Sequence, residues 1–251
     1  MPLIAVLTAA GTGLLAGPWL RGLVFAHSVP PGQPPRGSCP NCHTPVVATR
    51  WRALLAVAPV RGRCPTCTTR IGPPPGVVEG LAAAVLAVLA ASAPSAWVLG
   101  AWGWAALLGI ALAFIDTAMF RLPDTLTTAA IVGVLVLLGI AAATTGEPHP
   151  LIRALVAALV LGLLYLIAVL APGGGMGRGD AYLAVAVGAC LGWRGLGTVA
   201  DATRDTILLA AGYVLIMLAV RRIRRRDPVA YGVFILLGAL LAVATDPQKG
   251  G

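Results

Sequence analysis

Two aspartates lie at the ends of long apolar stretches of the chain. Asp116 comes near the end of one stretch, and Asp180 closes the glycine-rich run Gly175-Met-Gly-Arg-Gly-Asp180 at the start of another. Acids in or beside membrane segments are costly and are therefore functional candidates. Two close carboxylates share one proton, so the ionised group can deprotonate a water that attacks a peptide carbonyl while the protonated group donates to the developing oxyanion. The pair predicts hydrolysis by two aspartates.

The same residues allow other functions. Asp180 has the residue type and position of a helix N-cap, and Asp116 could pair with Arg121. Two acids at one membrane face would also serve a proton or ion pathway. The glycines before Asp180 leave bare backbone for the close approach of an extended substrate. A phosphate-binding loop is disfavoured, because no Gly-Lys-Ser/Thr follows them.

Four cysteines form a second set with chemistry of its own. Cys39-Pro-Asn-Cys42 and Cys64-Pro-Thr-Cys67 are two Cys-x-x-Cys knuckles with 21 residues between them. This spacing predicts a four-thiolate zinc site, and four thiolates leave no open position for catalysis, so its role is structural. Disulfides are disfavoured because the loop is expected in a reducing compartment. We expect His43 to be a bystander and Cys190 to be a packing residue.

The composition indicates where these sets lie. The chain has 251 residues, of which 58% are hydrophobic and 11% are charged, and its net charge is +9. Soluble chains carry about 25% charged residues, so the low charge excludes an ordinary soluble domain, a disordered chain and a secreted disulfide scaffold. The charges are confined to short blocks between apolar runs. This pattern is typical of an all-α polytopic membrane protein.

The apolar runs predict about eight transmembrane helices joined by a small zinc-binding loop. A spanning helix needs about 20 mostly apolar residues. The candidate segments, in chain order, are Leu3–His27, Val77–Pro94, Ala96–Phe120, Thr125–Thr144, Leu151–Ala171, Asp180–Val199, Thr206–Val220 and Val229–Ala244. We expect three parts: a first transmembrane helix at 1–28, a zinc-binding loop at 29–76, and a membrane-embedded domain at 77–251.

The basic residues predict the orientation. The first segment has no basic residue before it, which argues for a retained helix with its N-terminus outside rather than a cleaved signal. Most of the eighteen basic residues then fall on one side, in loops 28–76, 117–124, 172–179 and 221–228. By the positive-inside rule that side is cytoplasmic, and it carries the zinc loop and both aspartates. The charge is thus assigned to orientation and to membrane lipid, at Arg221–Arg226, without any nucleic acid.

The motifs resemble those of the bacterial type IV prepilin leader peptidases, which are membrane aspartic proteases of the Gly-x-Gly-Asp class. Gly177-Arg-Gly-Asp180 matches the element that gives the class its name, and Asp116 followed by Leu122-Pro-Asp124 resembles the first aspartate motif. Both cysteine pairs fall in the loop after the first helix, where many members bind zinc. The resemblance runs from about residue 14 to about residue 245.

The resemblance implies cleavage of a short basic leader from prepilins or pseudopilins at the cytoplasmic face of the bacterial inner membrane, just before the hydrophobic pilin helix. It implies Asp116 and Asp180 as the catalytic pair and Asp124 as a supporting acid, with Gly177 and Gly179 in the same motif. Zn2+ would bind Cys39, Cys42, Cys64 and Cys67. Many members also methylate the new N-terminus with S-adenosylmethionine, and Glu79 is the acid to test for that step.

Two positions differ from the residues that the family usually carries in these motifs. Tyr182 stands where members usually carry a lysine, and Arg21 ends Gly17-Pro-Trp-Leu-Arg21 where the family has asparagine. The second departure lies in the part linked to methyl transfer. The departure at Arg21 therefore bears on N-methylation rather than on leader cleavage, and Glu79 could equally cap its helix.

Charge adds a hypothesis about the substrate. A basic leader would be repelled by the arginines of this face and attracted by its few acids, for which Asp124, Asp227 and Glu79 are the candidates. We expect Asp124 to dock a leader Lys or Arg. Two other functions stay open at this point: a proton-coupled transporter that uses the aspartates as a relay, and a non-catalytic zinc-loop scaffold for pilus assembly.

Overall fold

The computed structural model describes residues 3–30, 32–48, 53–171, 176–224 and 227–245. Several basic residues of the orientation argument lie outside this part, namely Arg50, Arg52, Arg225, Arg226 and Lys249. The regular secondary structure of the described chain is helical, apart from two isolated β-bridges in the loop between α2 and α3. Its helices are α1 Leu3–Leu15, α2 Gly17–His27, α3 Val77–Ser92, α4 Ala96–Met119, α5 Asp124–Thr145, α6 His149–Leu170, α7 Arg178–Arg194, α8 Leu196–Ala219 and α9 Tyr231–Thr245.

Four of these helices are long and apolar enough to cross a membrane: α4, α5, α6 and α8, with 22 to 24 residues each. Helices α1 and α2 add a fifth span if they are taken as one, although they meet at an angle of 42°. The break falls beside Pro18 in the first turn of α2, where proline is tolerated. An all-helical membrane protein is therefore confirmed, with four to five membrane-capable helices in the described chain.

The prediction of about eight spans is not supported. Helices α3 and α9 have 16 and 15 residues, and at 1.5 Å per residue they are shorter than the roughly 30 Å of the hydrocarbon core. Helix α7 has 17 residues, among them Arg178, Asp180 and Arg194. Its apolar side chains are mostly buried against other helices, so its apolar run reflects a protein interior rather than contact with lipid.

The predicted boundary between the segments Asp180–Val199 and Thr206–Val220 was also wrong. The sequence interpretation ended one segment at Val199 and began the next at Thr206. The chain instead turns at Gly195, and α8 runs unbroken from Leu196. Arg204 pairs with Asp201 and Asp205 on this helix, so the polar residues are satisfied on its surface without ending it.

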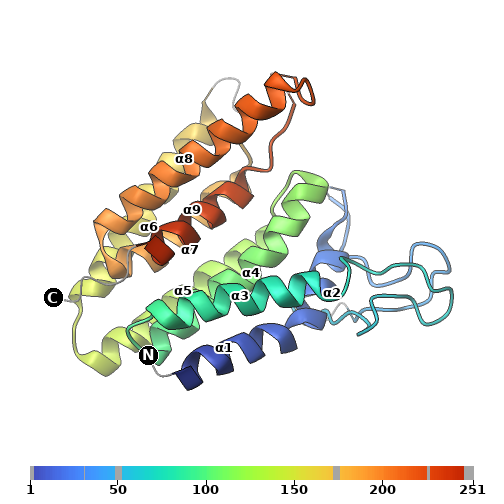
Figure 1. Ribbon diagram of the computed structural model, residues 1–251, viewed down its shortest axis with the longest axis horizontal. Coiled ribbons are helices and arrows are strands. Elements are labelled where there is room, and N and C mark those ends of the chain that lie inside the picture. The colour runs from blue at the N-terminus through green and yellow to red at the C-terminus, as the bar shows by residue number, and fades with distance from the viewer. Residues whose placement is uncertain (1–2, 31, 49–52, 172–175, 225–226, 246–251) are drawn as a thin grey trace.

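Helices α4 and α7 lie at the centre of the bundle. Helix α4 contacts α2, α3, α5, α7 and α9, and α7 contacts α4, α5, α6, α8 and α9. Helices α2, α4, α6 and α8 end, and α3, α5, α7 and α9 begin, at the same end of the bundle, at the right and top of Figure 1. This end therefore receives the C-terminus of α4, the N-terminus of α7 and the cysteine loop.

Candidate active site

Asp116 lies in the last turn of α4 with its side chain inside the protein, 4% exposed. Its Oδ2 accepts a hydrogen bond of 3.1 Å from the backbone N–H of Gly232, in the first turn of α9. No ion pair to Asp116 occurs among the described residues, so the alternative of a pair with Arg121 is not observed.

Asp180 lies in the first turn of α7 and is 6% exposed. Its Oδ2 accepts the N–H of Gly177 at 3.0 Å, which makes it a helix cap as the simpler interpretation expected. Its Oδ1 is buried and has no hydrogen-bond partner. One oxygen of Asp180 thus caps the N-terminus of α7, and the other remains available to exchange a proton.

Gly232 brings the two aspartates to one point. A Cβ built on Gly232 would lie 3.1 Å from Oδ2 of Asp116 and 3.4 Å from Oδ1 of Asp180. Both carboxylates therefore face the same short stretch of α9. The structure brings together the two acids that the sequence separated by 63 residues, and it adds α9 as a third wall.

Gly179 allows α7 to approach the α4–α5 connection. A Cβ at this position would lie 2.5 Å from Cβ of Leu122 and 2.9 Å from its carbonyl oxygen, which no side chain tolerates. Gly177 differs, because it is exposed and a Cβ there has room. The first glycine of the motif supplies a capping N–H, and the second supplies a close contact that holds Asp180 near Asp116.

Two tyrosines near the aspartate pair were missed by the sequence interpretation. The rings of Tyr165, in α6, and Tyr231, the first residue of α9, lie 6.1 Å apart, and Tyr231 directly precedes Gly232, where both aspartates meet. Tyr165 is buried at 7% exposure. A signal was present, because Tyr165 is the one hydroxyl-bearing residue of the apolar run Leu151–Ala171. Tyr182, at the family's lysine position, is 44% exposed instead.

Of the three acids considered for leader docking, Asp124 alone has a carboxylate with no partner in the described part of the chain. It is exposed at the start of α5, and its carboxylate has no hydrogen bond or ion pair within the described ranges. The carboxylate of Asp227 accepts the backbone N–H of Arg224 at 2.8 Å. Glu79 was expected to be an exposed acid, but its side chain is only 15% accessible.

Glu79 is paired with Arg21. Nε of Arg21 donates to Oε1 of Glu79 at 2.8 Å, and the same guanidinium donates to the carbonyls of Pro59 and Val60 at 3.1 and 3.0 Å. Oε2 of Glu79 accepts the N–H of Gly76 at 2.7 Å, so the capping alternative is confirmed. Arg21 is 1% exposed. The pair ties α2, α3 and the cysteine loop together.

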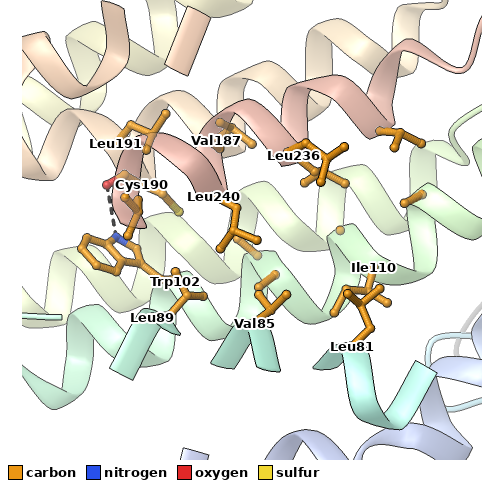
Figure 2. A pocket seen from close by; sticks show the side chains of 18 residues that line it. Leu81, Val85, Leu89, Trp102, Ile110, Val187, Cys190, Leu191, Leu236 and Leu240 are labelled. Carbon is orange, nitrogen blue, oxygen red and sulfur yellow. Dashed lines mark hydrogen bonds between the residues drawn. The ribbon is translucent and has the colours of Figure 1, made fainter. Parts of the chain in front are cut away.

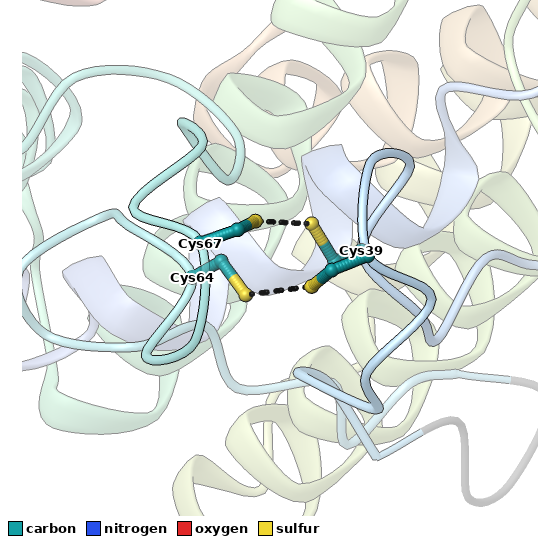
Figure 3. A group of neighbouring side chains, drawn as sticks. Cys39, Cys64 and Cys67 are labelled. Carbon is teal, nitrogen blue, oxygen red and sulfur yellow. Dashed lines mark hydrogen bonds between the residues drawn. The ribbon is translucent and has the colours of Figure 1, made fainter.

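The four cysteines form one cluster. All four Sγ atoms lie within 4.8 Å of one another. Figure 3 shows Cys39 opposite Cys67, with Sγ atoms 3.5 Å apart, and the Cys42–Cys64 distance is 3.6 Å. A tetrahedron of thiolates with zinc–sulfur bonds of about 2.3 Å has edges of about 3.8 Å. The cluster therefore has the geometry of a metal site.

The two knuckles share one backbone design. In each, the residue after the second cysteine has a positive φ, 57° at His43 and 59° at Thr68, and donates its N–H to the carbonyl of the first cysteine at 3.0 Å. His43 is exposed and lies outside the cluster, as expected. Hydrogen bonds from the hydroxyl and the backbone of Thr69 lower the pKa of the Cys67 thiol to about 5, which favours the thiolate that metals bind.

An apolar pocket of about 200 Å³ lies between α3, α4, α7 and α9. Figure 2 shows Leu81, Val85 and Leu89 of α3 facing Leu236 and Leu240 of α9 across it. One end is closed by Trp102, whose Nε1–H donates to the carbonyl of Cys190 at 3.1 Å. The other reaches Ala113, one turn before Asp116, and Val233, which follows Gly232. The pocket thus leads to the aspartates.

The fold and the site define a helical membrane protein in which two buried carboxylates converge at one end of the bundle. The type IV leader peptidase family matches residues 103–245, a range that contains both aspartates and Gly232. The chain belongs to the type IV leader peptidase family. The resemblance inferred from the sequence is confirmed.

Curated relatives agree with this assignment. The chain is 30% identical over 210 residues to a prepilin leader peptidase/N-methyltransferase of Aeromonas salmonicida strain A449, covering 83% of this chain and 71% of the relative. It is also 30% identical over 216 residues to the protein of the same name from Aeromonas hydrophila, with the same coverage. No solved structure gives a significant match.

Proposed function

We propose that the chain cleaves the leader peptide from prepilins or pseudopilins, with Asp116 and Asp180 as the catalytic pair. The observation that carries this proposal is the meeting of both carboxylates at Gly232. The family assignment favours a peptidase over a proton-coupled transporter and over a non-catalytic scaffold.

The reaction needs one proton shared by the pair. The ionised carboxylate takes a proton from a water while the water oxygen bonds to the scissile carbonyl carbon, and the protonated carboxylate donates to the carbonyl oxygen. The tetrahedral intermediate then collapses: one of its hydroxyls returns a proton to the carboxylate that donated it, the C–N bond breaks, and the leaving amine takes the proton that the other carboxylate received from water. The free Oδ1 of Asp180 suits this exchange, and the Gly232 N–H holds Asp116 in place.

The test is co-expression with a prepilin that bears a basic leader, read as a mass shift of the pilin. Wild-type chain should shorten the prepilin at a single bond. A transporter or scaffold would leave it intact while changing proton flux or pilus assembly alone, and that outcome would overturn the proposal.

The apolar pocket supports a substrate whose cleavage site adjoins a hydrophobic segment. Its lining is apolar along α3, α4, α7 and α9, and it ends one helical turn from Asp116. Apolar side chains that follow the scissile bond would be accommodated there without burying polar groups.

Asp124 is the proposed contact for the basic leader. Asp124→Asn should lower kcat/KM for a prepilin with a basic leader by about two- to fivefold at low salt, the range of a single exposed ion pair. The loss should shrink as ionic strength rises, because salt screens exposed charges. Cleavage rates across a salt series measure this effect.

Two controls accompany the measurement. Asp201→Asn removes an exposed carboxylate from α8, which is paired with Arg204, and it should leave the salt dependence unchanged. A prepilin whose leader basic residues are replaced by glutamine should be insensitive to Asp124→Asn. Equal rates for Asp124→Asn and wild type at every salt concentration would contradict the docking role.

Zinc is the proposed occupant of the cysteine cluster, with a structural role. Cys39→Ser or Cys64→Ser should lower bound zinc from about one per chain to near zero, because thiolate ligands are needed for tight binding. The loop 28–76 should then become sensitive to protease. Elemental analysis of purified protein and limited proteolysis measure the two effects.

Cys190→Ala is the matched control, since Cys190 is buried in α7 outside the cluster. It should keep its zinc. Full zinc content in both serine variants would show that the metal, if any, lies elsewhere.

N-methylation of the new pilin N-terminus is a second proposal for this chain. The relatives carry N-methyltransferase in their names, which makes S-adenosylmethionine the expected methyl donor. Glu79 does not fit as a free acid for that step, because both of its oxygens are engaged by Arg21 and Gly76. Transfer of a radiolabelled methyl group to the cleaved pilin decides whether the activity is present.

The topology completes the proposal. The C-terminus of α4, the N-terminus of α7 and the start of α3 share one end of the bundle. This supports an arrangement with the cysteine loop and both aspartates on the cytoplasmic side of the inner membrane and the N-terminus outside. The division into a first helix at 1–28, a zinc-binding loop at 29–76 and a peptidase domain at 77–251 is proposed with it. Accessibility of single introduced cysteines in intact cells tests the sidedness.

A further inference from the structure

Polar groups without partners gather where α2 ends. In the described part of the chain, four buried side-chain nitrogen or oxygen atoms have no hydrogen-bond partner, and three of them are His27 Nε2, Ser28 Oγ and Arg121 Nε. His27 and Ser28 are the last residue and the C-cap of α2. Arg121 follows the end of α4, and its charge acts on His27. Buried polar groups are normally paired, so this cluster calls for water or a ligand.

One of these groups, Ser28, lines a cavity of about 420 Å³. Ser28 and Arg36 line one side of it, and Thr117 and Ala118 of the last turn of α4 line another. Phe25 and the prolines of the loop that leads to α3 add apolar wall. The carboxylate of Asp116, which precedes Thr117, is bound to α9 instead, so the cavity is separate from the aspartate pair.

The charges near the cavity are positive and unneutralised. A guanidinium nitrogen of Arg36 donates to the carbonyl of Ser28, and the guanidinium lies 5.0 Å from the centre of the Phe25 ring. Neither Arg36 nor Arg121 has a carboxylate partner within the described ranges. A guanidinium presents several N–H donors in a planar fork that matches phosphate oxygens.

We propose that this cavity binds a phosphate group, with Arg36 and the Ser28 hydroxyl as direct ligands and Arg121 as a second positive charge. The cavity is larger than phosphate alone and has apolar walls, and it opens where two helices of a membrane bundle end. These features favour the phosphate of a membrane phospholipid. Inorganic phosphate offers the same chemistry from solution.

The experiment compares ligands on delipidated, detergent-solubilised full-length protein. Thermal unfolding is followed while phosphatidylglycerol, diacylglycerol, inorganic phosphate or ionic-strength-matched chloride is titrated. Phosphatidylglycerol should raise Tm in a saturable way, and diacylglycerol, which lacks phosphate, and chloride should not. A Tm rise with inorganic phosphate as well supports the phosphate chemistry, and a rise with phosphatidylglycerol alone supports the lipid source.

Three variants sharpen the result. Ser28→Ala and Arg121→Met should each weaken the apparent affinity by about five- to tenfold, the effect of losing one hydrogen bond or charge at an anion. Neither should destabilise the ligand-free protein, because each removes a buried polar atom that has no partner. Arg61→Met, an exposed arginine of the same loop, should bind as wild type does.

The proposal is overturned if neither phosphatidylglycerol nor inorganic phosphate raises Tm above the chloride and diacylglycerol controls. It is also overturned if Ser28→Ala and Arg121→Met keep wild-type affinity, or if they destabilise the ligand-free protein, since the atoms would then have structural partners. None of these measurements depends on peptidase activity.

Discussion

Asp116→Asn and Asp180→Asn should each lower the rate of leader cleavage by about 10³-fold or more, the upper part of the range for general acid–base groups. Asparagine keeps the size of the side chain and can accept the hydrogen bonds from Gly232 and Gly177. It cannot take a proton from water or give one to the substrate. The measurement is single-turnover cleavage of a purified prepilin.

The loss should not come from unfolding. Both carboxyl groups are buried at one point, and Oδ1 of Asp180 has no partner, so replacing either acid with an amide relieves the cost of holding a second ionisable acid at a buried site. Both variants should be at least as stable as the wild type in thermal unfolding. Active sites commonly carry such a cost in stability.

The effects of the two substitutions on the cleavage rate should not be additive. Residues that act as one unit lose their function together, so Asp116→Asn/Asp180→Asn should be no slower than either single variant. Asp201→Asn, which changes an accessible acid of α8 outside the pair, is the matched control and should keep wild-type activity. Wild-type cleavage by either single variant would remove that aspartate from the mechanism.

Glu79→Ala should lower the free energy of unfolding by about 3–5 kcal/mol, the usual cost of leaving one member of a buried ion pair alone. Arg21 would keep its charge at 1% exposure and would lose its carboxylate partner, and Gly76 would lose its cap. Thermal or denaturant unfolding in detergent measures the effect.

A double variant separates the ion pair from simple packing. Arg21→Leu/Glu79→Leu removes both charges and should be more stable than Glu79→Leu alone, because no uncompensated charge is left in the interior. Asp201→Ala is the exposed counterpart. Its partner Arg204 is 61% accessible, so the loss should stay below about 1 kcal/mol. Equal losses in the free energy of unfolding for Glu79→Ala and Asp201→Ala would show that the buried pair contributes no more to stability than the exposed pair.

This pair also explains a departure from the family. Arg21 stands where relatives are expected to carry asparagine, and the structure shows why a carboxylate must accompany it. A guanidinium at this depth needs a charged partner and two backbone carbonyls. Glu79 thereby joins the framework, and its availability for methyl transfer is reduced.

The local features were predictable because they depend on neighbours in the chain. Two Cys-x-x-Cys knuckles predicted one cluster, and it forms. The long apolar runs at 96–120, 125–144 and 151–171 predicted α4, α5 and α6 to within a few residues. The count of spans failed because hydrophobicity does not separate a helix buried by protein, such as α7, from one that faces lipid.

The sequence by itself determined the residue types that can do the chemistry: two aspartates in family motifs, four thiolates at metal-binding spacing and an acid beside Leu122-Pro123. Spacing and periodicity carry such information because they act over a few residues. Only the tertiary structure decided that Gly232, 116 residues beyond Asp116, closes the site. It also decided that Tyr165 packs against Tyr231 next to Gly232 and that Arg21 pairs with Glu79. These contacts join distant segments, and packing of whole helices, rather than any local pattern, sets which of them form.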